Sequence, residues 1–162
     1  MTIKTLATLA AAPVIAAAAF SCGGDNVPET KDTELPKIVA GSAVPSPTDC
    51  QVYKRGDSIP FRYAMEDNMQ LGAFNIEVHH NFDNHTHGTQ GAVCQPPAKK
   101  EPVNPWVFNK SYTIPEEYKT RYEAGIDIPI PEDIDPGYYH FVVRLLDAAG
   151  WQEMKAMGIV IE

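Results

Sequence analysis

Apolar and polar residues alternate along several short segments of this chain, with the two-residue period of a β-strand that buries one face. The alternating segments are residues 59–65, 74–78, 126–130 and 139–145. Shorter apolar runs lie at residues 38–39, 106–108, 112–114 and 159–161. Turn-forming residues separate these segments at spacings near ten residues, the spacing typical of antiparallel β-sandwiches. The pattern therefore predicts an all-β, immunoglobulin-like antiparallel β-sandwich of about seven strands.

The composition agrees with that fold, and the sequence also contains one long predicted loop. The 14 prolines in 162 residues favour short strands and turns over long helices. Residues 81–105 form a long predicted loop rich in His, Asn, Gly, Gln and Pro. Loops of this length in a small domain are usually functional or disordered, so this loop is the first place to look for a site.

The N-terminal segment has the pattern of an export signal. Lys4 precedes a nearly uninterrupted apolar run over residues 6–20, which is too short for a comfortable membrane span. The run ends at Ala19-Phe20-Ser21-Cys22, which resembles a lipobox, where the cysteine receives a lipid. We expect a lipoprotein signal peptide over residues 1–21, a lipidated flexible tether over residues 22–35 and the Ig-like domain over residues 36–162. The alternative is ordinary signal cleavage near Ala19, with Cys22 left free.

The three cysteines fit this interpretation. With Cys22 lipidated, Cys50 and Cys94 remain as one pair in an oxidising compartment. A disulfide between them would stabilise the fold by about 4 kcal/mol on the chain-entropy argument. Two unpaired buried thiols are the alternative.

The charge of the chain excludes one class of partner. The formal net charge is -8, and no cluster of Lys and Arg exceeds two residues. A nucleic-acid partner requires a basic patch or stripe, so we expect none.

The most distinctive chemistry is a histidine cluster. His79, His80, His85 and His87 lie within nine consecutive residues of a chain that has five histidines in all. On the strand that ends here, alternation puts His80 on the apolar face and His79 on the other. An extended backbone would turn His85 and His87 to the same side, and Asp83 could serve as a ligand or orient one.

The fifth histidine, His140, lies on a strand whose apolar face carries Tyr139 and Phe141, so it should point to the opposite side. It is a further candidate ligand, and whether it meets the cluster depends on the order of the strands in the sheet. Imidazole and carboxylate ligands without a thiolate favour Zn²⁺ or Cu²⁺ over Ca²⁺ or Mg²⁺. Three alternatives without an ion stay open: histidines that satisfy loop backbone groups, a pH-responsive surface, and a solvated polar loop.

Two resemblances accompany these patterns. The run IDIPIPEDIDPGYYHFVVRLLDAAGWQEMKAMGIVIE resembles the last strands of bacterial Ig-like and cadherin-like modules. EVHHNFDNHTHG together with YYHFVVRLLDAAGW is similar to an uncharacterised family of Ig-like lipoproteins typical of Bacteroidota. This second resemblance implies a surface or periplasmic location and is compatible with a metal role, but it implies no established activity.

Catalysis is not expected. The chain has no His-Glu-x-x-His helix, no Gly-x-Ser-x-Gly turn and no phosphate-binding glycine loop. The expected function is therefore that of a non-enzymatic envelope lipoprotein that captures or buffers zinc or copper. Its location would be the outer membrane or cell surface, with the periplasmic face as the alternative. The expected partners are the lipid bilayer, a metal ion and an envelope protein or transporter. The competing function is an adhesion, glycan-binding or protein-binding module that uses no metal.

Overall fold

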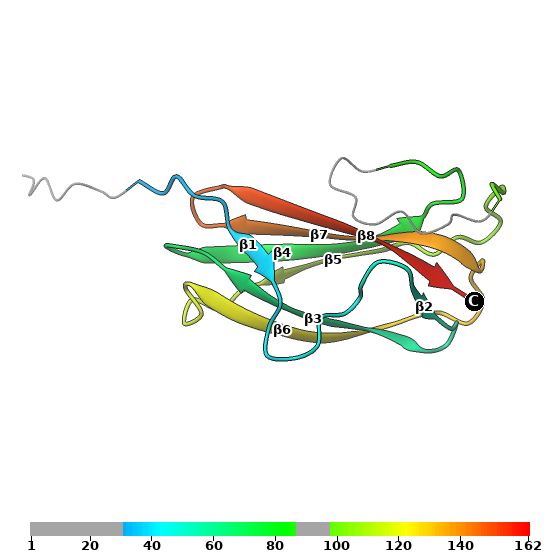
Figure 1. Ribbon diagram of the computed structural model, residues 1–162, viewed down its shortest axis with the longest axis horizontal. Helices are drawn as coiled ribbons and strands as arrows, with labels where there is room; N and C mark the ends of the chain where they lie inside the picture. Colours follow the sequence, from blue (N-terminus) through cyan, green and yellow to red (C-terminus); the bar gives the residue numbers. More distant parts are fainter. Residues whose placement is uncertain (1–30, 87–97) are drawn as a thin grey trace, which may run out of the picture. The chain divides into compact units, whose positions relative to one another are not determined.

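The computed structural model describes residues 31–86 and 98–162, of which Asp32–Glu162 form one compact unit (Figure 1). This unit is an all-β sandwich of two sheets, and the predicted Ig-like architecture is confirmed with eight strands. The strands are β1 (Lys37–Val39), β2 (Gln51–Tyr53), β3 (Ser58–Glu66), β4 (Leu71–His80), β5 (Phe108–Thr113), β6 (Arg121–Pro129), β7 (Gly137–Asp147) and β8 (Gln152–Ile161).

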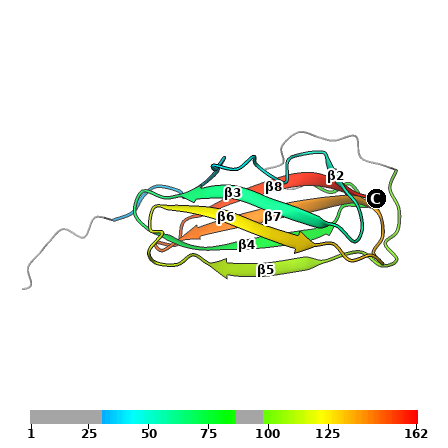
Figure 2. The same cartoon turned by 90° about the horizontal axis from the view of Figure 1, so that it is seen from below.

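The two sheets have the strand orders β1-β3-β6 and β2-β8-β7-β4-β5. All neighbouring strands are antiparallel except β2, which runs parallel to β8. Figure 2 shows β3 and β6 lying across the face of β4 and β7. The short strand β2 is an addition to the predicted set, because three residues are too few to show a period in the sequence.

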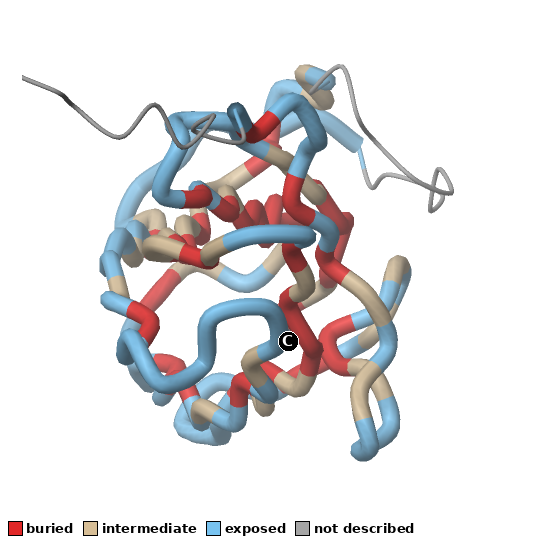
Figure 3. The backbone as a smooth tube through the Cα atoms, turned by 90° about the vertical axis from the view of Figure 1, so that its left-hand side faces the viewer, coloured by how far each residue is buried: buried red, intermediate tan, exposed pale blue. Residues whose placement is uncertain are grey.

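The side chains between the sheets form an aromatic core. Phe61 of β3 is fully buried and contacts Phe74 of β4 and Phe141 of β7, with ring centroids 6.0 and 5.9 Å apart. The end-on view in Figure 3 shows the buried stretches near the centre and the exposed ones around the outside. The alternating residues of the sequence therefore supply the inner face of each sheet.

Tyr139 anchors the start of β7. Its hydroxyl donates a hydrogen bond to the carbonyl oxygen of Asp135, 2.6 Å away, and accepts one from the amide of Trp106 at 3.3 Å. A tyrosine bonded to the backbone a few residues upstream is the tyrosine corner of Ig-like sandwiches. Because side chains alternate along a strand, fixing Tyr139 toward the core directs the next residue, His140, to the outer face of the sheet.

Several predicted features lie outside the described residues. These are the signal peptide, Cys22, His87 and Cys94, so the Cys50–Cys94 pairing and the lipid anchor stay predictions. Within residues 31–86 and 98–162, no helix is long and apolar enough to cross a bilayer.

We expect Tyr139→Phe to lower the free energy of unfolding by about 1–3 kcal/mol, because it leaves the carbonyl of Asp135 without its hydroxyl donor. Chemical denaturation of the purified protein measures this loss. The control is Tyr118→Phe, on an exposed ring, with a change within about 0.5 kcal/mol. Equal stability of the two variants would mean that the tyrosine corner contributes nothing.

Candidate metal centre

The pairing of β4 with β7 brings two distant histidines together. His79 lies near the end of β4 and His140 near the start of β7, and the antiparallel register places them directly opposite each other. Directly opposite residues project from the same face of a sheet, with Cβ atoms about 5 Å apart. Both side chains occupy the outer face of the five-stranded sheet, because Val78 and Phe141 beside them point into the core.

The loop after β4 turns back over this face. The amide of Asn81 donates to the carbonyl of Tyr138 at 2.7 Å, and the ring of Phe82 packs edge-on against Tyr139. Asn84 then has a positive φ of 59°, in the left-handed region that Asn tolerates better than most residues. This reversal returns the chain, and His85 comes to lie against His79.

Three imidazoles converge at this point. The rings of His79 and His85 stack nearly parallel with centroids 5.4 Å apart, and the ring of His140 stands perpendicular to both. One nitrogen from each histidine lies within 4.8 Å of the other two. We call His79, His85 and His140 the histidine triad.

The spacing within the triad fits one ion. The Nε2 atoms of His79 and His85 are 3.3 Å apart. Two ligands bound at about 2.05 Å to a tetrahedral ion are separated by about 3.3 Å, whereas neighbouring ligands in a square plane would be about 2.9 Å apart. The observed distance therefore matches a tetrahedral site more closely than a square-planar one.

A carboxylate lies beside the Nδ1 atom of two triad members. His79 Nδ1 is 3.0 Å from Glu77 Oε1, and His85 Nδ1 is 2.6 Å from Asp83 Oδ1. Histidines that bind metals usually donate the other ring N–H to such a carboxylate, which fixes the tautomer and the ring orientation. In both residues this arrangement directs Nε2 toward the other histidine.

The third member is oriented by an amide. His140 is fully buried, and its Nε2 lies 2.8 Å from the side-chain amide of Asn81. Asn81 is itself buried and held by its backbone hydrogen bond to Tyr138. His85 and His140 are thus hydrogen-bonded to Asp83 and Asn81 of the loop, and His79 lies beside the carboxylate of Glu77.

The two carboxylates have lowered pKa values. Hydrogen bonding from His85 lowers the pKa of Asp83 from 3.8 to about 2. For Glu77, burial raises the pKa, but the hydrogen bond and charge of Arg144, 2.6 Å away, together with His79, outweigh burial and lower it. Both carboxylates are therefore ionised at neutral pH and favour positive charge beside them.

The structure separates the predicted ligands into groups. His79, His85 and His140 come together, and Asp83 lies beside His85 rather than in the triad. His80 lies outside this group, with its ring against Phe82 at 4.9 Å, because it belongs to the opposite face of β4. His87 lies outside the described residues.

Sequence reasoning did not assign three supporting residues: Glu77, Asn81 and Arg144. The parity of β4 puts Glu77 on the same face as His79, and this signal was present in the sequence. The contributions of Asn81 and Arg144 depend on the pairing of β4 with β7, which the sequence does not reveal.

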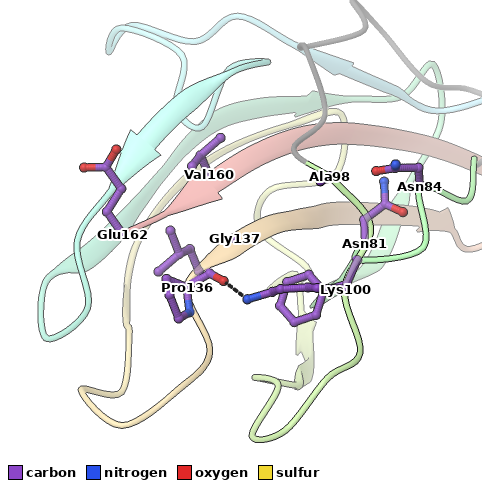
Figure 4. Close-up of a pocket in the computed structure, with 10 residues that line it drawn as sticks. Asn81, Asn84, Ala98, Lys100, Pro136, Gly137, Val160 and Glu162 are labelled. Carbon is purple, nitrogen blue, oxygen red and sulfur yellow. Dashed lines mark hydrogen bonds between the residues drawn. The ribbon is translucent and has the colours of Figure 1, made fainter.

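An open cleft of about 600 Å³ adjoins the loop (Figure 4). Its mostly apolar wall includes Phe82, Pro136 and Val160, and Asn81 and Asn84 form part of its rim. The amine of Lys100 lies over the ring of Phe82 and donates to the carbonyl of Pro136. A molecule bound in the cleft would therefore contact the same loop that carries His85.

Fold and site together define an Ig-like β-sandwich with a candidate three-histidine metal centre on the outer face of its larger sheet. Residues 20–162 match a domain of unknown function, DUF4625, and the chain belongs to this family. No curated protein matches the sequence. The expected membership of an uncharacterised domain family is thus confirmed, and the lipoprotein character stays a prediction.

We expect His85→Ala to raise the pKa of Asp83 from about 2 toward 3.8, because the imidazole is the main cause of the shift. Carboxyl carbon chemical shifts followed against pH measure this. A lowered pKa favours the folded state above the ordinary value, so the stabilisation is present above about pH 4 and is lost as the pH falls toward 2. Glu77 is the internal control, since its pKa depends on Arg144 and His79. An unchanged Asp83 titration would contradict the described contact.

Proposed function

We propose that this protein is an envelope lipoprotein that binds one transition-metal ion, zinc or copper, through His79, His85 and His140, for capture or buffering. The observation that carries the proposal is the pair of Nε2 atoms 3.3 Å apart, each on a ring whose Nδ1 faces a carboxylate. Neutral imidazoles backed by carboxylates are good ligands for these ions.

Zinc is the first ion to test. The 3.3 Å separation matches neighbouring ligands of a tetrahedral ion, the geometry that zinc prefers. Cupric copper prefers a square-planar or tetragonal arrangement. The sequence supplies His87, two residues after His85, as the candidate fourth ligand.

The proposal is binding rather than catalysis. Zinc proteases place a general-base carboxylate beside the bound water. The two nearest carboxylates, Glu77 and Asp83, lie instead against the Nδ1 atoms of the ligand histidines. In that position they orient the rings, which supports a site built to hold an ion.

The second candidate function is recognition of an organic ligand or a protein segment without metal. The apolar cleft beside Phe82 and Val160 favours it. A chelator separates the two functions, because ligand binding in the cleft should persist after the metal is removed.

The metal proposal predicts about one Zn²⁺ per chain by titration calorimetry at pH 7.5. In the His79→Gln plus His85→Gln variant, we expect binding at this site to be lost, because two of the three nitrogens are removed. Asp83→Asn should weaken binding by about 10- to 100-fold, because it keeps all three imidazoles and removes only the carboxylate beside His85.

His80→Gln is the matched control, since it removes a neighbouring imidazole outside the triad and should leave the affinity unchanged. Circular dichroism checks that each variant remains folded. Undiminished Zn²⁺ binding in the double variant would overturn the assignment of the site.

The anchor has its own test. We expect the full chain to incorporate labelled palmitate in a bacterial host and to fractionate with membranes, because Cys22 would carry the lipid. Cys22→Ser should abolish both, whereas Cys50→Ser should leave labelling intact. Label retained in the Cys22→Ser variant would refute lipidation at this cysteine.

A further inference from the structure

Three aspartates meet at the opposite end of the sandwich from the histidine triad. Asp67 directly follows β3, Asp147 is the last residue of β7, and Asp32 is the first residue of the compact unit. Leu71, at the start of β4, pairs with Asp147. Figure 1 shows the β3–β4 and β7–β8 turns together at one end and the loop after β4 at the other.

Each of these carboxylates uses one oxygen to accept a local hydrogen bond. Asp32 Oδ1 accepts from the amide of Glu34, and Asp147 Oδ1 accepts from the amide of Trp151. Asp67 Oδ2 accepts from two amides, those of Met69 and Gln70, at 2.7 and 2.6 Å. These bonds fix the orientation of the three side chains.

The other oxygen of each carboxylate has no hydrogen-bond partner. These oxygens are Asp32 Oδ2, Asp67 Oδ1 and Asp147 Oδ2, and all three are buried. The residues are 8%, 8% and 2% exposed, and one oxygen from each lies within 4.8 Å of the other two. None of the ion pairs among the described residues involves these aspartates.

Such a cluster is unfavourable without a cation. A buried carboxylate loses its hydration, and neighbouring negative charges repel each other across a medium of low dielectric constant. Buried aspartates are accordingly paired or bound to metals in most proteins. Three clustered, buried aspartates, each with one unpartnered oxygen, therefore call for a positive charge that no ion pair among the described residues supplies.

We propose that Asp32, Asp67 and Asp147 form a binding site for one calcium ion. Calcium binds six to eight oxygens at about 2.4 Å, so oxygens on opposite sides of the ion are about 4.8 Å apart, and the three carboxylates fit around one centre. Water and carbonyl oxygens complete such shells. Magnesium gives up its water reluctantly and usually takes one or two carboxylates, and zinc and copper favour the nitrogen ligands of the histidine triad.

The site has a structural consequence. It joins the segment before β1 to the β3–β4 turn and to the end of β7. Trp151 already links two of these parts, the segment before β1 and the end of β7, because its indole nitrogen donates to the carbonyl of Asp32 and its amide donates to Asp147. Bound calcium would fasten the beginning of the compact unit to this end of the sandwich.

The calcium site does not rest on the proposed function. It uses oxygen ligands where the triad uses nitrogen. The distance from Leu71 to His79 along β4 separates the two sites by about 26 Å, at about 3.3 Å per strand residue. Either site can therefore be lost without the other.

The experiment uses the whole protein after treatment with a calcium chelator. We expect about one Ca²⁺ per chain by titration calorimetry, a rise in melting temperature with Ca²⁺ and a change in tryptophan fluorescence. Asp67→Asn should weaken Ca²⁺ binding by at least about tenfold, because a charged ligand is removed while the side-chain oxygen can still accept from Met69 and Gln70.

The same variant also tests how the charge of Asp67 affects the melting temperature when calcium is absent. In chelator, Asp67→Asn should melt at a higher temperature than the wild type, because one buried negative charge is gone. A purely structural aspartate would give a lower melting temperature instead. Asp147→Asn is the second variant, with the same two expectations. Asp127→Asn, on an exposed carboxylate paired with Arg62, is the control and should keep the full Ca²⁺ response.

The His79→Gln plus His85→Gln variant should keep its Ca²⁺ response while losing Zn²⁺ binding, so the failure of one proposal is distinguishable from the failure of the other. The calcium proposal is overturned if the wild type shows no binding heat and no thermal shift with Ca²⁺. It is equally overturned if both Asp67→Asn and Asp147→Asn keep the wild-type response.

Discussion

The antiparallel pairing of β4 with β7 is the interaction on which both candidate sites depend. At one end of this pair the register sets His79 opposite His140, and at the other it sets Leu71 beside Asp147. A slip of one residue would move every side chain of a strand to the other face. Such a slip is costly here, because Phe74 and Phe141 would leave the aromatic core. Core packing therefore fixes the position of polar groups that lie outside the core.

The two clusters present different chemistry to cations. In the histidine triad the candidate ligand atoms are imidazole nitrogens, and the carboxylates of Glu77 and Asp83 lie beside the Nδ1 atoms of His79 and His85. In the aspartate cluster the charge is carried by the candidate ligand atoms themselves, and no basic side chain is paired with them among the described residues. The first arrangement suits a borderline or soft ion and the second a hard one. Under the two proposals, a single sandwich would therefore bind different ions at its two ends.

Local patterns predicted much of this architecture, and nonlocal pairing accounts for what they missed. Alternation through Phe74 and Val78 was enough to identify the strand and to place His79 on its outer face. It could not show that His140 lies opposite, since that depends on the order of strands in the sheet. His80 was grouped with the ligands because it is adjacent in sequence, although parity turns it away. The aspartates at 67 and 147 were each part of a polar turn in the sequence, and only the fold reveals their burial.

The edge strands of the two sheets determine how readily one copy of the protein could pair with another. β1 and β2 span three residues each, β5 exposes Asn109, Lys110 and Ser111, and β6 carries exposed Arg121 and Asp127. Short or charged borders offer a poor template for adding a strand from another molecule. Even at high local concentration, neighbouring copies would therefore have little tendency to join through their sheet edges.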